Sequence, residues 1–173
     1  METAREIKIP KMRIAVLIGR EGETKKEIEH RTKTRIEVDK EGDVTILGKS
    51  IDIMVSEQIV KAIARGFSPE NALTLVNEDY MLDVMDIKEY CSTDNAMTRL
   101  KGRVIGKKGE SRNNLEKLTA TKISVFGKTV SILGRTENVI NARNAIDMLL
   151  SGARHATVYA YVEKANKKMR TML

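Results

Sequence analysis

Two short glycine loops contain the residues of this chain whose types and spacing best suit a chemical task. Residues Gly19–Gly22 read Gly-Arg-Glu-Gly, and residues Gly106–Gly109 read Gly-Lys-Lys-Gly. Glycine allows a ligand backbone to approach the main chain closely, and it permits turns that other residues resist. Where such a loop opens a helix, free N–H groups and the positive end of the helix dipole face the ligand, and lysines add charge. The spacing therefore predicts sites for a sugar-phosphate backbone.

Residues for catalysis or metal binding are few. Cys91 is the single cysteine, and His30 and His155 are the two histidines. A lone cysteine excludes an internal disulfide framework, and these three residues have no zinc-site spacing. A nucleophilic pair of Cys91 and His155 is the sharpest enzymatic hypothesis, but no local motif supports it, and neither a catalytic carboxylate cluster nor a nucleotide-binding loop is recognisable. We predict a non-enzymatic protein that needs no metal and no cofactor.

Positive charge is concentrated in the second half of the chain. The net charge is +7 overall; Met1–Asp79 has 14 basic and 15 acidic residues, and Tyr80–Leu173 has 17 and 9. This asymmetry predicts that the second half meets a polyanion, nucleic acid rather than membrane, although ordinary solubility charge is the alternative. The longest apolar run, Ile14–Ile18, is too short to cross a bilayer, and the first thirty residues lack a signal pattern. We expect a cytoplasmic protein.

Both glycine loops belong to an internal repeat. Residues 16–24 align with residues 103–111 at an offset of 87, and residues 44–48 align with residues 130–134 at an offset of 86. A chain of 173 residues has room for two domains of roughly 80 residues each. The repeat therefore predicts two domains of the same fold.

Each copy contains the same order of predicted elements, β-α-α-β-β-α. Proline ends a strand, alternating apolar residues indicate strands, and glycine closes helices. In the first copy we expect a strand that ends at Pro10, a short helix to Gly19, a helix from Glu23, strands over 35–38 and 44–47, and a helix capped by Ser50 that ends at Gly66. In the second we expect a strand over 81–87, a helix capped by Asp94, a hairpin turn over 126–128 and a helix over 136–152.

Two further helices are predicted outside the repeats. Ser68 and Pro69 have the order of a cap and a first helical residue, which indicates a short linker helix to Asn77. After the second copy, apolar residues recur at helical spacing from Val158 to Met169 among several lysines. We expect this basic amphipathic helix to dock on the protein's own core, with partner binding as the alternative.

At this point the sequence resembles the KH family. Residues Lys101–Gly109, Lys-Gly-Arg-Val-Ile-Gly-Lys-Lys-Gly, are close to the core motif of that family, and a helix after the hairpin is typical of type I. The resemblance implies an α+β fold of two type I KH domains, each with a three-stranded antiparallel sheet packed against three helices. We place the domains at residues 1–67 and 80–152, the linker helix at 68–79, and the C-terminal basic amphipathic helix at 153–173.

KH domains bind about four unpaired nucleotides in an apolar groove, and few aromatic residues are needed for this. We expect the second copy to bind RNA more strongly, because the first has an acidic hairpin, Asp39 to Asp43, opposite its loop. Leu115 and Ile123 are expected near the groove or in the core. The candidate RNA-binding residues are Arg103, Val104, Ile105, Gly106, Lys107, Lys108, Gly109, Arg112, Lys122 and Lys128, with Gly19, Arg20, Glu21 and Gly22 in the first copy.

The arrangement of two KH domains over residues 2 to 170 also resembles archaeal relatives of the eukaryotic small-subunit pre-rRNA processing factor called partner of Nob-one. That resemblance implies binding of single-stranded RNA near the 3′ end of small-subunit ribosomal RNA, in cooperation with a PIN-domain endonuclease. The intact loop Gly19–Gly22 departs from family members in which this loop has decayed. An adaptor of translation initiation or RNA decay that mainly docks protein partners is the alternative function.

Overall fold

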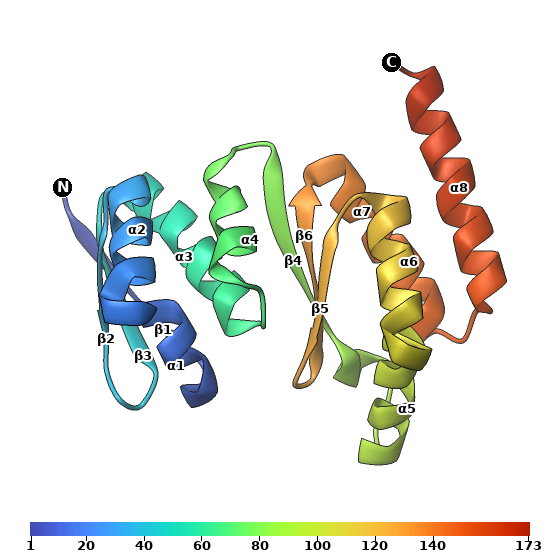
Figure 1. The fold of residues 1–173 in the computed structure, drawn as a ribbon, viewed down its shortest axis with the longest axis horizontal. Helices are drawn as coiled ribbons and strands as arrows, with labels where there is room; N and C mark the ends of the chain where they lie inside the picture. Colours follow the sequence, from blue (N-terminus) through green and yellow to red (C-terminus); the bar gives the residue numbers. More distant parts are fainter. The chain divides into compact units, whose positions relative to one another are not determined.

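Two three-stranded antiparallel sheets organise the chain, one in each half (Figure 1). The computed structural model describes all 173 residues. The chain forms two compact units, Met1–Tyr80 and Met81–Leu173. The strand order is β1-β3-β2 in the first unit and β4-β6-β5 in the second. This architecture confirms the predicted α+β class and the KH-type fold.

The first unit follows the predicted order of elements closely. Strand β2 spans the four residues that were predicted, and it pairs with β3 from Arg35 opposite Leu47 to Val38 opposite Val44. In chain order the elements are β1 (Thr3–Lys8), α1 (Ile14–Ile18), α2 (Glu23–Thr32), β2 (Arg35–Val38), β3 (Asp43–Gly48), α3 (Ser50–Ala64) and α4 (Pro69–Leu73).

The second unit repeats this order and adds one long helix. A two-residue turn joins β5 to β6, with Phe126 opposite Thr129 and Gly127 at a φ of 55°. In chain order the elements are β4 (Tyr80–Asp86), α5 (Asp94–Ile105), α6 (Glu110–Thr119), β5 (Lys122–Phe126), β6 (Thr129–Arg135), α7 (Thr136–Leu150) and α8 (His155–Thr171).

Equivalent residues of the two copies build the two cores. Leu17 and Val104 lie in the last turns of the first helices, Ile28 and Leu115 lie in the second helices, and all four side chains have no exposed surface. Burial of one such side chain stabilises a fold by about 1.5–3 kcal/mol. The repeat in the sequence is therefore a repeat of core positions, which is why it predicted the fold of both units.

A pair of polar contacts is also repeated. Glu29 accepts a hydrogen bond from the Ile36 N–H at 2.8 Å, and Glu116 accepts one from the Ile123 N–H at 2.9 Å. Each bond ties the second helix of a unit to its edge strand. The strand beside the glycine-loop helix is thereby held in register with that helix in both copies.

An arginine caps the C-terminal end of α3 and of α7. Arg13 donates to the carbonyl oxygens of Ile63, at 2.7 Å, and Phe67, at 2.8 Å. Arg103 donates to Leu149, at 3.0 Å, and to Ala153. The accepting residues are equivalent in the repeat, but the arginines are not, since Arg103 aligns with Val16. Each guanidinium satisfies carbonyl groups that the end of a helix leaves without partners.

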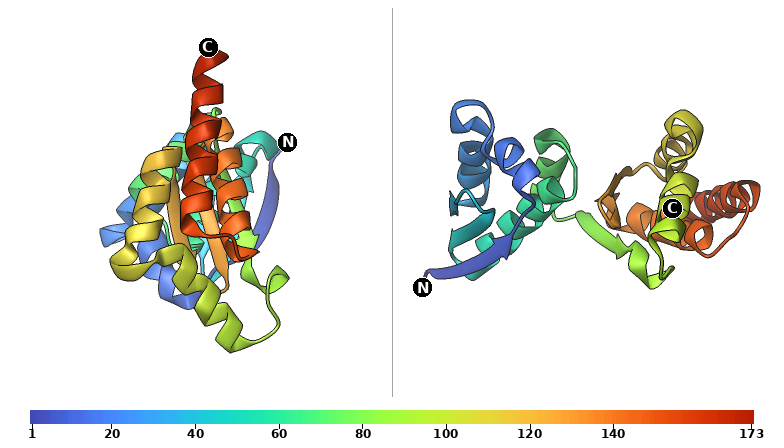
Figure 2. Two further views of the ribbon diagram at one scale, coloured as in Figure 1. Left: turned by 90° about the vertical axis from the view of Figure 1, so that its right-hand side faces the viewer. Right: turned by 90° about the horizontal axis from the view of Figure 1, so that it is seen from below.

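Helix α8 docks on the second unit. It packs against α6 and α7 on their side away from the sheet (Figure 2), and Val158 and Val162 have no exposed surface. The expected docking on the protein's own core is therefore the arrangement in the structure. The predicted linker helix is α4, which is capped by Ser68 through the Asn71 N–H and packs against α3 inside the first unit.

Two predicted caps are wrong. Lys49 is the cap position of α3, without a side-chain bond, so Ser50 is the first helical residue. At α5 the Thr93 hydroxyl accepts the Ala96 N–H at 3.1 Å, and Asp94 is the first helical residue. None of the helices is both long and apolar enough to cross a membrane.

Candidate nucleic-acid interface

The two glycine loops have the same backbone conformation. The first glycines, Gly19 and Gly106, both have a φ of 74°, and the second glycines, Gly22 and Gly109, have φ values of 78° and 75°. Between them, Lys108 has a φ of 55°, in the left-handed region that is unfavourable for a residue with a side chain. Each loop follows the first helix of its unit and leads directly into the second. Both copies therefore keep the geometry of the predicted site.

The two glycines of a loop are needed for different reasons. A Cβ atom on Gly106 would lie 2.6 Å from the Ser111 Cβ and 2.7 Å from the Ser111 nitrogen, so the turn itself requires glycine there. A Cβ atom on Gly109 would meet nothing within 4 Å. The surface beside Gly109 is thus open, as a site for close approach of a phosphate backbone must be.

The helices that follow the loops begin without a side-chain cap. Gly109 precedes α6 and Gly22 precedes α2, and neither position makes a capping side-chain bond. By contrast, Thr93 caps α5 and Ser68 caps α4. The N–H groups of Glu23 and Glu110 bond to the loop carbonyl oxygens of Arg20 and Lys107. An anion would therefore meet the next N–H groups of the first turn, where the helix dipole favours its binding.

One glycine that the sequence analysis did not include in the site lies on the face of α5 beside the loop. Gly102 is exposed, and a Cβ atom there would have no heavy atom within 4 Å. Ile105, three residues on and on the same helix face, is half-buried. Together they form an open apolar surface beside Gly106. The signal for Gly102 was present in the sequence, because a helical glycine without a packing role is unfavourable by about 1 kcal/mol.

Several candidate residues lie where RNA contact is geometrically reasonable. Lys107 and Lys108 are exposed on the loop, and Lys128 is exposed on the turn between β5 and β6. Arg112 occupies the position of Lys25, whose ammonium group lies 3.1 Å from the Ile36 carbonyl oxygen on β2. That position faces the space between the second helix and the edge strand.

Three other candidates belong outside the groove. Val104 is completely buried in the core and presents no surface to a ligand. Arg103 caps α7, so its guanidinium is already occupied. Lys122 follows the far end of α6, about 15 Å along the helix from the loop. It also neighbours the buried Ile123 on β5, so the Lys122 side chain points to the opposite face of the sheet. We leave these three out of the interface.

The acidic hairpin of the first copy is partly neutralised. Glu41 lies 2.9 Å from the Lys11 ammonium group, and Asp43 lies 3.3 Å from that of Lys8. Asp39 accepts the N–H groups of Asp43 and Glu41, both at 2.9 Å, and the bond to Asp43 is the main cause of the lowered pKa of its carboxyl group. The hairpin surface is therefore less negative than the sequence suggested. The difference in charge between the two copies accordingly lies more in the loop residues.

The catalytic hypothesis gains no support from the geometry. The Cys91 thiol lies 3.5 Å from the Ile87 carbonyl oxygen, and the His155 Nε2 atom lies 2.8 Å from the Arg103 carbonyl oxygen. No group of three or more His, Cys, Asp or Glu side chains is arranged to hold a metal ion. Each residue of the proposed nucleophilic pair thus contacts a backbone carbonyl group, Cys91 within its own turn and His155 on another helix.

Two units of this topology, each with a glycine loop between its first two helices, define a tandem type I KH protein. The profile of the second KH domain of PNO1-type proteins, described as a eukaryotic-type KH domain (KH-domain type I), matches residues 4–78 and again residues 81–167. The chain belongs to this family, and within it to the group of the Pno1 and Dim2 proteins, which confirms the resemblance found in the sequence.

Relatives from two domains of life are similar to the chain. A KH domain-containing protein of Methanocaldococcus jannaschii is 47% identical over 169 residues, which are 95% of this chain and 74% of the relative. The pre-rRNA-processing protein PNO1 of Chaetomium thermophilum is 33% identical over 111 residues, 62% of this chain and 42% of PNO1. The chain thus spans less than half of that eukaryotic protein.

A solved structure has a similar fold. The complex of a/eIF2α, aDim2p and rRNA from Pyrococcus horikoshii contains a chain that matches with a TM-score of 0.90 and 42% identity, over 96% of both chains. The fold of the whole chain is therefore shared with a protein that has been crystallised together with ribosomal RNA.

Proposed function

We propose that the chain binds single-stranded ribosomal RNA of the small subunit, near its 3′ end, and acts in pre-rRNA processing during ribosome assembly. The observation that carries the proposal is the second loop, which joins an open glycine, two exposed lysines and an uncapped helix start. The names of the PNO1 relatives and the rRNA complex of aDim2p support the same assignment. In this proposal the second KH domain provides most of the RNA affinity.

The decisive experiment compares matched charge variants of the two loops. Replacing Lys107 and Lys108 by Asp reverses two charges beside the phosphates and leaves both glycines in place. Charge-assisted hydrogen bonds contribute about 1.5–3 kcal/mol each, so we expect a loss of affinity of at least about tenfold to a hundredfold. The counterpart variant, with Arg20 and Glu21 replaced by Asp, reverses one charge, because Glu21 is already acidic, and should lose only about a few-fold.

The measurement is fluorescence anisotropy with a labelled single-stranded RNA from the 3′ end of the small-subunit rRNA, with a duplex of the same sequence as control. The logarithm of the binding constant should fall with the logarithm of salt concentration by about 0.7 for each phosphate neutralised. Thermal melts must show that both variants are folded. A first-loop variant that loses more affinity than the second-loop variant, or equal binding of the duplex, would contradict the proposal.

We also propose that the chain binds RNA without cutting it, and that a PIN-domain endonuclease does the trimming. Purified chain should leave the RNA intact with or without divalent metal ions. RNA cleavage that disappears when one carboxylate of the chain is replaced would overturn this part of the proposal.

The adaptor function is a second candidate, because the aDim2p complex contains a/eIF2α as well as rRNA. An adaptor that mainly docks proteins should bind a/eIF2α with little dependence on salt and bind RNA weakly. Titration of both ligands at low and physiological salt separates the two functions, since phosphate contacts lose affinity steeply over that range.

A further inference from the structure

An ion pair joins the first strand of each unit to the last helix of the repeat, and its charges are opposite in the two copies. In the first unit the Arg5 guanidinium group of β1 lies 3.3 Å from the Glu57 carboxylate of α3. In the second unit the Asp83 carboxylate of β4 lies 2.5 Å from the Arg143 guanidinium group of α7. The basic residue is thus on the strand in one copy and on the helix in the other.

The backbone shows that the two ion pairs occupy equivalent places. The Ile9 N–H group donates to the Gly42 carbonyl oxygen at 2.8 Å, and the Ile87 N–H group donates to that of Lys128 at 2.9 Å. Gly42 and Lys128 correspond at the offset of 86 residues, and so do the two helix residues of the ion pairs. The two strand residues each lie four positions before the isoleucine, so they correspond as well.

A third charged residue extends each ion pair to a cluster. The Lys61 ammonium group lies 3.0 Å from the Glu57 carboxylate, and Asp147 takes the position of Lys61 in α7. The hydrogen bond to the strand carboxylate is the main cause of the raised pKa of Arg143, and the charge of Asp147 adds to it. Asp147 also accepts the Tyr90 hydroxyl group at 2.5 Å. The order of charges is therefore basic, acidic, basic in the first unit and acidic, basic, acidic in the second.

Apart from these charges, the first strands meet nearly the same surroundings. Both β1 and β4 are edge strands beside the middle strand of their sheet. The middle strands read Val-Thr-Ile-Leu-Gly at residues 44–48 and Val-Ser-Ile-Leu-Gly at residues 130–134. Ile9 and Ile87, just after the two strands, are both buried. Apolar patterns as similar as these do not determine which first strand joins which sheet.

The charge clusters do distinguish the two arrangements. On the second sheet, β1 would bring Arg5 against Arg143. On the first sheet, β4 would bring Asp83 against Glu57, and these carboxylate side chains are only 18% and 11% exposed in their own units. Like charges at such partly buried positions repel each other. The third residue of each cluster would offset only one of the two like charges.

A cross-strand pair adds to the discrimination against β4 on the first sheet. Lys8 of β1 lies opposite Asp43 of β3, and their charged groups are 3.3 Å apart. Asp86 is the equivalent residue of β4, where it accepts the Lys88 N–H group at 2.9 Å. On the first sheet, β4 would therefore place two carboxylates opposite each other, and like charges directly opposite in a sheet are destabilising.

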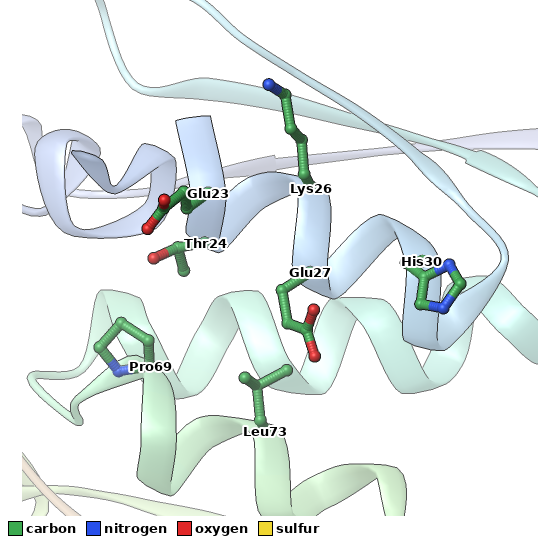
Figure 3. A pocket seen from close by; sticks show the side chains of 7 residues that line it. All are labelled: Glu23, Thr24, Lys26, Glu27, His30, Pro69 and Leu73. Atoms are coloured by element: carbon green, nitrogen blue, oxygen red, sulfur yellow. The ribbon is translucent and has the colours of Figure 1, made fainter. Parts of the chain in front are cut away.

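The groove between α2 and α4 shows no such inversion. It has a volume of about 610 Å³ and is lined by acidic and basic side chains together (Figure 3). Glu27 of this groove is paired with Arg31 at 2.5 Å. Asn114 and Leu118 stand at these two positions in the second copy, so the ion pair has no counterpart of opposite order there.

We propose that the inverted charge clusters direct each first strand to its own unit, so that the chain folds without exchanging strands between its two copies or between two chains. Misassembly and domain swapping are characteristic failures of repeat proteins. An exposed ion pair adds little to the stability of a fold. Here the same charges also penalise the wrong arrangement, which is how a sequence excludes a close alternative. This role concerns folding and goes beyond RNA binding.

The test reverses the ion pair in one unit or in both, in the full-length chain. Asp83→Arg with Arg143→Asp gives the second unit the strand and helix charges of the first. Arg5→Asp with Glu57→Arg gives the first unit those of the second. Either double variant keeps an ion pair in each unit and removes the difference between the units. The fourfold variant combines both changes and restores the difference.

Each variant is refolded from urea at low and high protein concentration. Size-exclusion chromatography with light scattering measures dimers, and nuclear Overhauser contacts between β1 and β6, or between β4 and β3, identify exchanged strands. We expect each double variant to form exchanged species at least about fivefold more often than the wild-type chain. The fourfold variant should return to the wild-type level.

Stability and correct strand pairing should run in opposite directions in the fourfold variant. Its reversed helix residues lie one turn from Lys61 and Asp147 and have the same sign as these neighbours, so it should be the least stable of the set. Equal levels of exchanged species in the wild-type chain and a folded double variant would overturn the proposal. More exchange in the fourfold variant than in the double variants would also overturn it, because a role in stability alone predicts that order. If one double variant does not fold, the other provides the same comparison.

Discussion

Gly102 offers a sharp test of where the RNA lies, because the protein itself does not need a glycine there. The residue lies in the last turn of α5, and a Cβ atom would meet nothing within 4 Å. Glycine in a helix is less favourable than alanine by about 0.5–1 kcal/mol. Gly102→Ala should therefore stabilise the second unit by up to about 1 kcal/mol, as measured by urea denaturation.

RNA affinity should change in the opposite direction. If the RNA backbone or a base packs over Gly102, added atoms overpack that contact, which costs about 1–3 kcal/mol in well-packed sites. We expect roughly a fivefold loss of affinity for Gly102→Ala and roughly a hundredfold loss for Gly102→Leu. The assay is anisotropy of a labelled single-stranded RNA at constant salt. A stable protein that binds less RNA would show that this glycine serves the ligand and not the fold.

Ala15 provides the matched control, since it is the exposed residue at the equivalent position of α1. Ala15→Leu should leave RNA affinity nearly unchanged, because the first loop contributes little. The reasoning fails if Gly102→Leu binds RNA as tightly as the wild-type chain, or if Gly102→Ala unfolds the second unit more easily.

Further predictions concern stability. Ala120→Gly should stabilise the second unit by about 1 kcal/mol, because Ala120 has a φ of 53° at the end of α6. Ala160→Gly, inside α8, is the control and should destabilise this unit by a similar amount. Urea denaturation measures both changes. Burial, and then the bond to Asp147, raise the pKa of Tyr90 to about 12. Because the pKa of Tyr90 is higher in the folded than in the unfolded chain, the protonated hydroxyl group stabilises the fold fully below pH of about 10, and this contribution is lost as pH rises toward 12. In thermal melts across this pH range, Tyr90→Phe should lack this pH-dependent loss of stability. Arg103→Leu should cost about 2–3 kcal/mol in the same denaturation assay, and an unchanged midpoint would show that the cap of α7 is dispensable.

The fold was predictable because the repeat aligns core positions. Ile36 and Ile123, for example, both lie on edge strands after the second helix, and both are buried. Two independent copies of one apolar pattern fix the periodicity better than either copy alone. The helix caps were less predictable. Thr93 and Asp94 are both good capping types, and only the extended backbone of Thr93 decides between them.

The site was predictable in its loops and less so around them. The spacing of the glycines determines the turn, so Gly106 and Gly109 could be placed from the sequence. Lys122 was included as a candidate, although the apolar Ile123 beside it indicates that the lysine points to the opposite face. Arg103 could not have been assigned, because its partners lie 46 and 50 residues along the chain.

The two arginine caps record how the copies diverged. If both units descend from one ancestral domain, they began with the same residue at every aligned position. Arg13 now aligns with Leu100, and Arg103 aligns with Val16, so each of these two positions changed in at least one copy after the duplication. The bond to the end of α3 and of α7 is present in both copies, although the residue that makes it lies at a different position of the first helix region. An alignment of the two copies shows a mismatch at both positions, although the two arginines bind equivalent carbonyl groups.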